Sequence, residues 1–128
     1  MAAAMTNYLA NAIRDHVLRN TAYTSPTTVY VALFTTATTE AGGGTEVTGG
    51  SYARQSITFA AGAINGQADQ SGSITYTNMP AATVVAAALY DAVSAGNMLF
   101  HGRLPRQRVV ASGASFTLNS GDLQVLID

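Results

Sequence analysis

The stretch TTVYVALF at residues 27–34 decides the fold, because the spacing of apolar side chains changes there. Upstream of it, Leu9, Ile13 and Val17 recur at three- and four-residue intervals, which predicts one amphipathic helix over about residues 6–20. From residue 27 onward the period is two, and apolar side chains alternate to both faces of the expected strand. We therefore expect a strand covered on both sides, preceded by a helix that packs on the sheet or projects to a partner.

The rest of the chain predicts short strands separated by turns. They are expected at residues 54–59, 73–77, 84–90, 98–104, 115–118 and 123–127, with a long exposed Gly- and Thr-rich loop at about residues 38–52. The sequence thus predicts an all-β fold: an antiparallel β-sandwich or jelly roll of about seven to eight strands over residues 27–128, with one N-terminal α-helix. At 128 residues the chain has the size of a single domain, 1–128.

The composition excludes several kinds of chemistry. Only 10% of the residues are charged, against about a quarter in an ordinary soluble domain, and lysine, cysteine and tryptophan are absent. Without lysine there is no Schiff base or Walker A loop, and without cysteine there is no thiolate nucleophile, cysteine zinc site or disulfide. A formal net charge of -1 gives no basis for wrapping nucleic acid, and no apolar run is long enough to span a bilayer. We expect no cofactor, no direct nucleic-acid contact and no membrane contact.

No catalytic motif stands out. His16 and His101 are the side chains that titrate near neutral pH, but there is no Gly-x-Ser-x-Gly elbow with which to build a nucleophilic triad. The seven carboxylates are scattered and show no calcium-loop spacing. The expectation is a protein that is not an enzyme, without catalytic, cofactor or metal sites, in which both histidines pack at element edges or interfaces.

Three groups of residues are candidates for protein contacts. The arginines at 103, 106 and 108 form the densest charge in the chain, which suits bidentate contacts to an acidic partner or, alternatively, a solvated hairpin tip. The glycine-rich loop resembles a phosphate cradle, but it leads to a strand and lacks lysine, so a loop ordered by a partner is favoured. The predicted interface residues are Tyr8, His16, Gly43, Glu46, Tyr52, Arg103, Arg106 and Arg108.

Two strings in the first half of the chain resemble a family of small tailed-bacteriophage virion proteins. They are NYL through DHVLR at residues 7–19, continued by TAYTSPTTVYVALF at 21–34, and EAGGGTEV at 40–47, continued by GGSYAR at 49–54. Weaker likenesses follow at residues 90–92, 96–102 and 121–123. Members of this family are often labelled tail or tail-fibre proteins, while similar small jelly-roll proteins serve as capsid cement. The resemblance implies a virion structural protein and brings no catalytic residues to carry over.

From this resemblance we expect a capsid cement or decoration protein that binds the outside of the shell and bridges neighbouring major capsid proteins. Its expected location is the capsid surface of the virion, after synthesis in the bacterial host cytoplasm. The alternative is a tail or tail-fibre-associated structural or adhesin module, which would bind another tail protein or a host glycan through Tyr23, Tyr52 and Tyr90. The neutral surface also predicts self-association, with a homodimer favoured over a trimer.

Overall fold

The structure, a computed structural model, describes residues 2–127. Within these residues one helix and nine strands follow one another along the chain. They are β1 (Ala2–Met5), α1 (Asn7–Leu18), β2 (Val29–Phe34), β3 (Gln55–Ala61), β4 (Gln67–Ser71), β5 (Ile74–Tyr76), β6 (Ala82–Tyr90), β7 (Met98–Val110), β8 (Phe116–Leu118) and β9 (Gln124–Leu126). The helix and all strands except β1 and β4 correspond to predicted elements, so an all-β fold with one N-terminal helix is confirmed.

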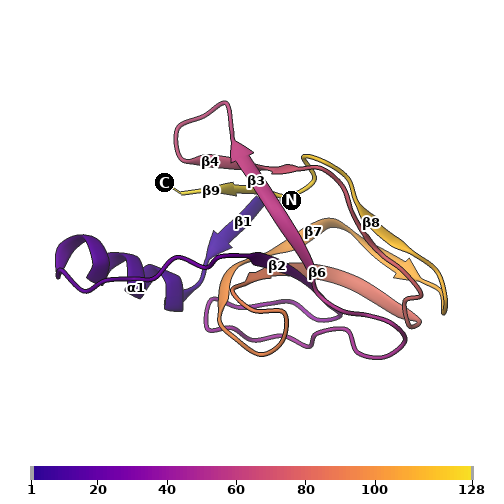
Figure 1. The fold of residues 1–128 in the computed structure, drawn as a ribbon. Helices are drawn as coiled ribbons and strands as arrows, with labels where there is room; N and C mark the ends of the chain where they lie inside the picture. Colours follow the sequence, from indigo (N-terminus) through magenta and orange to yellow (C-terminus); the bar gives the residue numbers. More distant parts are fainter. Residues whose placement is uncertain (1, 128) are drawn as a thin grey trace.

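Seven of the described strands close into a barrel (Figure 1). Around the ring the order is β1, β7, β6, β2, β3, β4 and β9, and β9 then pairs with β1. A closed ring with an odd number of strands cannot alternate in direction throughout, so at least one pair must be parallel. Here that pair is β1 with β9, and the other pairs are antiparallel. The expected jelly-roll sandwich is not confirmed, because these strands join edge to edge into one closed sheet.

The two strands that the sequence did not predict, β1 and β4, complete the ring. Strand β1 has the sequence AAAM and β4 has QADQS, so neither shows the alternation that indicates a half-buried strand. Strand β1 joins β7 to β9 through the pairs Ala4–His101 and Ala3–Val125, while β4 joins β3 to β9. Closure of the barrel therefore depends on backbone pairing that leaves little trace in the side-chain pattern.

Strand β2 is buried on both faces, as predicted. Val31 and Leu33 are fully buried in the main core, which also contains side chains of the separate two-stranded β5–β8 sheet. Ala32 and Phe34 belong to a second cluster on the opposite face, with buried residues of β6 and β7. The buried hydroxyl of Tyr76 in β5 donates to the Val31 carbonyl oxygen at 2.7 Å, which ties the small sheet to the barrel.

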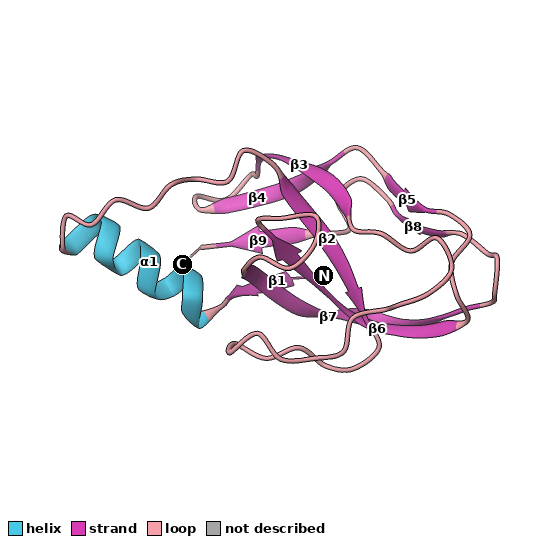
Figure 2. Ribbon diagram, turned by 60° about the horizontal axis from the view of Figure 1, so that its bottom comes forward, coloured by secondary structure: helices cyan, strands magenta, loops and turns pink. Residues whose placement is uncertain are grey.

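Helix α1 and the chain that returns from it form an arm, residues 6–28, that stands out from the barrel (Figures 1 and 2). Thr6 caps the helix, because its hydroxyl accepts from Leu9 N at 3.4 Å. The same hydroxyl donates to a carbonyl oxygen of β7 at 2.6 Å. Leu9 is the one buried residue of the helix. Val17 is 68% exposed and Leu18 is 78% exposed. The helix thus projects from the barrel instead of packing along it.

Strand β7 contains a bulge that sets the position of the arginines. Between the consecutive pairs Val84–Arg108 and Ala86–Arg103, the register advances by two residues along β6 and by five along β7. Pro105 lies in this bulge, where its missing N–H costs no ladder hydrogen bond. Arg103 and Arg108 are paired residues on either side of the bulge, and Arg106 lies within it.

Candidate interaction surfaces

The predicted interface residues lie on three parts of the molecule. Tyr8 and His16 lie on the arm, Gly43, Glu46 and Tyr52 lie between β2 and β3, and Arg103, Arg106 and Arg108 lie on β7. Tyr8 meets the tip of the β2–β3 loop at the base of the arm, whereas Arg106 and Arg108 line a separate pocket that contains no residue of the first two groups.

At the base of the arm, Tyr8 lies beside the tip of the loop. Tyr8 is 43% exposed and lines a hollow of about 260 Å³ together with Glu40 and Gly42. A backbone hydrogen bond from Asn7 N to Glu40 O, 2.9 Å long, joins the helix to the loop. Gly43 lies next to this contact, and its amide donates to a threonine hydroxyl of the loop at 3.0 Å. The predicted residues Tyr8 and Gly43 therefore belong to neighbouring parts of one surface.

On the outer part of the arm, the side chain of His16 contacts the returning chain. Nδ1 of His16 accepts a hydrogen bond from Tyr23 N at 3.1 Å, which joins the helix to the returning chain. Val17 and Leu18 follow His16 and present their aliphatic side chains to solvent. His16 therefore orders the arm, and the apolar surface comes from two residues that sequence reasoning did not place at an interface.

The loop between β2 and β3 folds back along β2. Val47 N donates to Leu33 O at 2.9 Å, and Phe34 forms an isolated β-bridge with Glu46. The loop thus pairs with β2 at one isolated bridge. The prediction of an exposed loop is correct at residues 39–42 but wrong at Val47, which is 2% exposed. The reason is that the side chain of Val47 is part of the main core.

Within the segment between β2 and β3, Glu46, Tyr52 and Arg54 form an ionic cluster. Nε and Nη2 of Arg54 donate to the two carboxylate oxygens of Glu46 at 3.0 and 2.9 Å, and the Tyr52 hydroxyl donates to the same carboxylate at 2.7 Å. Nη1 of Arg54 donates to two carbonyl oxygens of the β6–β7 loop at 3.0 and 2.8 Å. The guanidinium lies 3.7 Å from the ring centroid of Tyr90. This cluster therefore ties two loops together and occupies the polar atoms of Glu46 and Tyr52.

The ionic cluster also fixes the charge of its members. Burial alone would raise the pKa of Glu46, but hydrogen bonds from Arg54 and Tyr52 and the positive charge of Arg54 outweigh it, so the pKa lies below its usual value. Burial, together with the hydrogen bond to Glu46, raises the pKa of Tyr52. Sequence reasoning named Glu46 and Tyr52 but missed Arg54. The available signal was an arginine at the start of a strand, in a chain that has only six basic residues.

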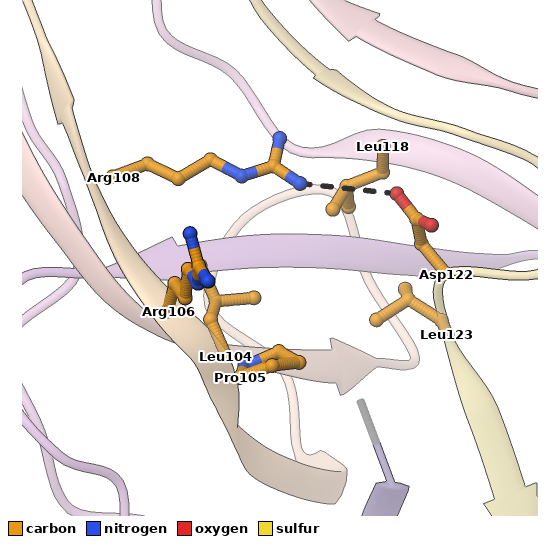
Figure 3. A pocket seen from close by; sticks show the side chains of 7 residues that line it. All are labelled: Leu104, Pro105, Arg106, Arg108, Leu118, Asp122 and Leu123. Carbon is orange, nitrogen blue, oxygen red and sulfur yellow. Dashed lines mark ion pairs between the residues drawn. The ribbon is translucent and has the colours of Figure 1, made fainter.

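On β7, Arg106 and Arg108 line one pocket of about 270 Å³, and Arg103 is not part of its lining (Figure 3). Nη1 of Arg108 donates to the Thr117 carbonyl oxygen at 2.7 Å, and Nη2 lies 3.9 Å from a carboxylate oxygen of Asp122. The structure therefore brings together two of the three predicted arginines. Their setting is a pocket between β7, β8 and the turn before β9, not an isolated hairpin tip.

The two histidines lie in different surroundings. His16 bonds a backbone amide, and Nδ1 of His101 lies 3.0 Å from the hydroxyl of Thr38 while its buried Nε2 has no partner. Within residues 2–127 no three metal-ligating side chains gather in a way that could hold an ion. In the same range no helix is long and apolar enough to cross a membrane.

The structure thus combines a small barrel with a projecting arm, an ordered loop and a pocket lined by two arginines. Comparison with protein families identifies the chain as a bacteriophage virion structural protein. The chain belongs to the family described as podophage GP4 fiber I protein gp80, whose model matches residues 4–126. No curated protein matches the chain. The expectation of a phage virion structural protein is confirmed, whereas the match does not single out a capsid cement.

Proposed function

We propose that this chain is a non-enzymatic structural subunit of a podophage fibre, joined to its neighbour in the virion by the arm. The observation that carries the proposal is the exposure of Val17 and Leu18, 68% and 78%, at the far end of the arm. Aliphatic side chains that a helix holds out into water favour a contact with another protein. The description of the family as a fiber protein supports the fibre as the place where the arm docks.

One arm supplies a useful contact that is weak by itself. Burying a valine or leucine side chain contributes about 1.5–3 kcal/mol, so the two together give roughly 3–5 kcal/mol before the cost of association. This is too little to hold an isolated pair of proteins at low concentration. It is enough where several copies bind side by side, because linked contacts raise one another's effective concentration.

The arm is also ordered before it binds. Asn7 N donates to Glu40 O at 2.9 Å at its base, and both Arg19 N and Thr21 N donate to Asp15 O, at 3.1 and 3.0 Å, where the chain turns back. Because both ends of the helix are fixed in the free chain, little conformational entropy is lost when the arm docks. A preformed arm suits a structural contact.

The adhesin form of the fibre alternative has less support, because two of the three tyrosines expected to stack on a glycan are occupied. Tyr90 lies under the guanidinium of Arg54, and Tyr52 stacks on Tyr76 with ring centroids 5.9 Å apart. Capsid cement is the second candidate and is supported by the resemblance of the sequence alone. It would use the same arm, with the major capsid protein as the neighbour.

Gold labelling of a tagged chain on intact virions, imaged by electron microscopy, separates the two candidates. We expect gold on the tail or its fibres. Gold spread evenly over the head would overturn the fibre assignment in favour of capsid cement.

The contact made by the arm is tested by incorporation of variants into virions. Leu18→Asp should lower the amount of chain found in purified particles, because the aspartate cannot be buried without losing its hydration. Ile64→Asp is the matched control, since Ile64 is 62% exposed but lies between β3 and β4, away from the arm. Equal incorporation of both variants would refute docking by the arm. Sedimentation of the isolated chain at high protein concentration, where a weak contact is populated, tests whether the neighbour is a second copy: the dimer expected there should become a monomer in Leu18→Asp.

A further inference from the structure

A second candidate binding site lies at the β7 bulge, in the pocket of about 270 Å³ that Figure 3 shows from close by. Four of its lining residues are apolar: Leu104, Pro105, Leu118 and Leu123. Leu118 and Leu123 are almost fully buried, while Leu104 and Pro105 come from the bulge itself. The pocket therefore combines apolar side chains that the fold holds in place with the charged groups of two arginines and Asp122.

The guanidinium groups of Arg106 and Arg108 have N–H groups that donate no hydrogen bond within the described residues. Arg108 uses Nη1 for the Thr117 carbonyl oxygen, and its guanidinium lies 4.8 Å from the ring centroid of Phe116, which holds the side chain in one place. Nη2 of Arg108 lies 3.9 Å from Asp122, which is an ion pair but too long for a hydrogen bond. Arg106 makes no hydrogen bond or ion pair within residues 2–127. A ligand that accepts hydrogen bonds can therefore be bound by both arginines.

Charge and size narrow the class of ligand. Two arginines and one aspartate give the lining a net charge of +1, which suits a ligand with a single negative charge better than a phosphate dianion. Guanidinium groups with free N–H donors bind carboxylates in a bidentate geometry. At about 270 Å³ the pocket is slightly smaller than the 300–1,000 Å³ of typical small-molecule sites, so it takes a group about the size of one residue.

We propose that this pocket binds the carboxylate of an apolar C-terminal residue on a partner polypeptide. In such a residue the carboxylate and the aliphatic side chain leave the same carbon atom, so one residue meets both the arginines and the leucines. An acidic sugar also carries a carboxylate but has no aliphatic side chain to place against Leu104 and Pro105. A sugar ring also could not stack on the nearby ring of Phe116, because Arg108 covers that ring.

The site is tested on the isolated full-length chain by amide chemical shifts in nuclear magnetic resonance. N-acetyl-leucine at millimolar concentrations should shift the resonances of Leu104, Arg106 and Leu123 in a saturable manner. N-acetyl-leucinamide keeps the side chain but lacks the charge, and it should not bind. Arg106→Gln should weaken the binding of N-acetyl-leucine about tenfold, because a hydrogen-bonded ion pair is lost. Arg103→Gln, on the same strand but outside the pocket, should leave the affinity unchanged.

Three outcomes would overturn the proposal. The absence of a saturable shift with N-acetyl-leucine would show that the pocket has no affinity for this group. Equal binding of the acid and its amide would show that the arginines do not recognise a carboxylate. Tighter binding of glucuronate than of N-acetyl-leucine would assign the pocket to an acidic saccharide. None of these results depends on where in the virion the chain is found. The pocket proposal can therefore fail while the fibre assignment holds, and the reverse is also true.

Discussion

Replacing Arg54 by methionine should destabilise the protein strongly, because this substitution removes the centre of the ionic cluster. Methionine keeps an unbranched stem of similar volume but has no donor. It leaves the Glu46 carboxylate with the Tyr52 hydroxyl alone, and it leaves two carbonyl oxygens of the β6–β7 loop without the guanidinium. The loop between β2 and β3 and the loop between β6 and β7 would then lose their main polar connection.

The size of the effect follows from the burial of the two partners. Breaking a buried ion pair by removing one partner costs about 3–5 kcal/mol. The side chain of Arg54 is 7% exposed, but that of Glu46 is 26% exposed, so water reaches the carboxylate and the lower end of this range applies. We expect a loss of about 3 kcal/mol in the free energy of unfolding, which lowers Tm by about 10 °C in a domain of this size.

Urea unfolding followed by circular dichroism measures this loss, and tyrosine fluorescence provides a second probe because the chain has no tryptophan. Arg19→Met is the matched control. Arg19 is 67% exposed and pairs with Asp15 at 3.3 Å, so its replacement should cost less than about 0.5 kcal/mol. If Arg54→Met were destabilised by no more than the control, the cluster would contribute little to stability and the reasoning would be wrong.

The same variant should change how stability depends on pH. In the folded protein the pKa of Glu46 lies below the usual value of 4.5, so its contribution is fully present above pH 4.5 and is lost as pH falls through the lowered pKa. Without Arg54, burial raises the pKa and this contribution disappears. The stability gap between wild type and Arg54→Met should therefore shrink in acid. A gap of constant size would show that Arg54 does not act through the charge of Glu46.

Three further substitutions test other parts of the fold. Thr6→Val keeps the shape of the side chain but removes the helix cap and the hydrogen bond to β7, so it should cost about 1–2 kcal/mol and speed hydrogen exchange in the first turn of α1. Tyr76→Phe leaves the buried carbonyl of Val31 without its donor and should cost about 1–2 kcal/mol in urea unfolding. Gly50→Ala should lower Tm clearly more than Gly42→Ala: both residues have positive φ, but a Cβ at Gly50 would lie 2.7 Å from a backbone oxygen, whereas none is near Gly42.

The predictable part of this fold is the part that buries alternating side chains. Strand β2 is the clearest case, since Val31 and Leu33 enter one core and Ala32 and Phe34 the other, as the period of two indicates. Strands β1 and β4 were missed because an alanine-rich segment and a polar segment show no such period. Since these two strands close the ring, the same gap in the pattern explains why a sandwich was expected in place of a barrel.

The contact surfaces were predicted less well, because contacts between distant residues decide them. Residue type predicted Glu46 and Tyr52 as interface residues. The structure shows that the Glu46 carboxylate instead accepts hydrogen bonds from both Arg54 and Tyr52 within the chain. Conversely, helical periodicity gave Val17 the same spacing as the buried Leu9, although the helix leaves the barrel after its first turn and Val17 reaches solvent. A periodic pattern indicates which face of a helix is apolar, but not what covers that face.

Closure of the barrel limits how this module can join an assembly. Each of the seven barrel strands is paired with two neighbours, so the barrel offers few free edges to which a partner could add a strand. With few charges on the surface, long-range attraction between oppositely charged faces is also weak. The proposed contacts use what departs from the regular ring: the arm, which extends the chain beyond the barrel, and the β7 bulge, which contributes Leu104, Pro105 and Arg106 to the arginine pocket. The two features that break the regularity of the barrel are therefore the two that we assign to binding.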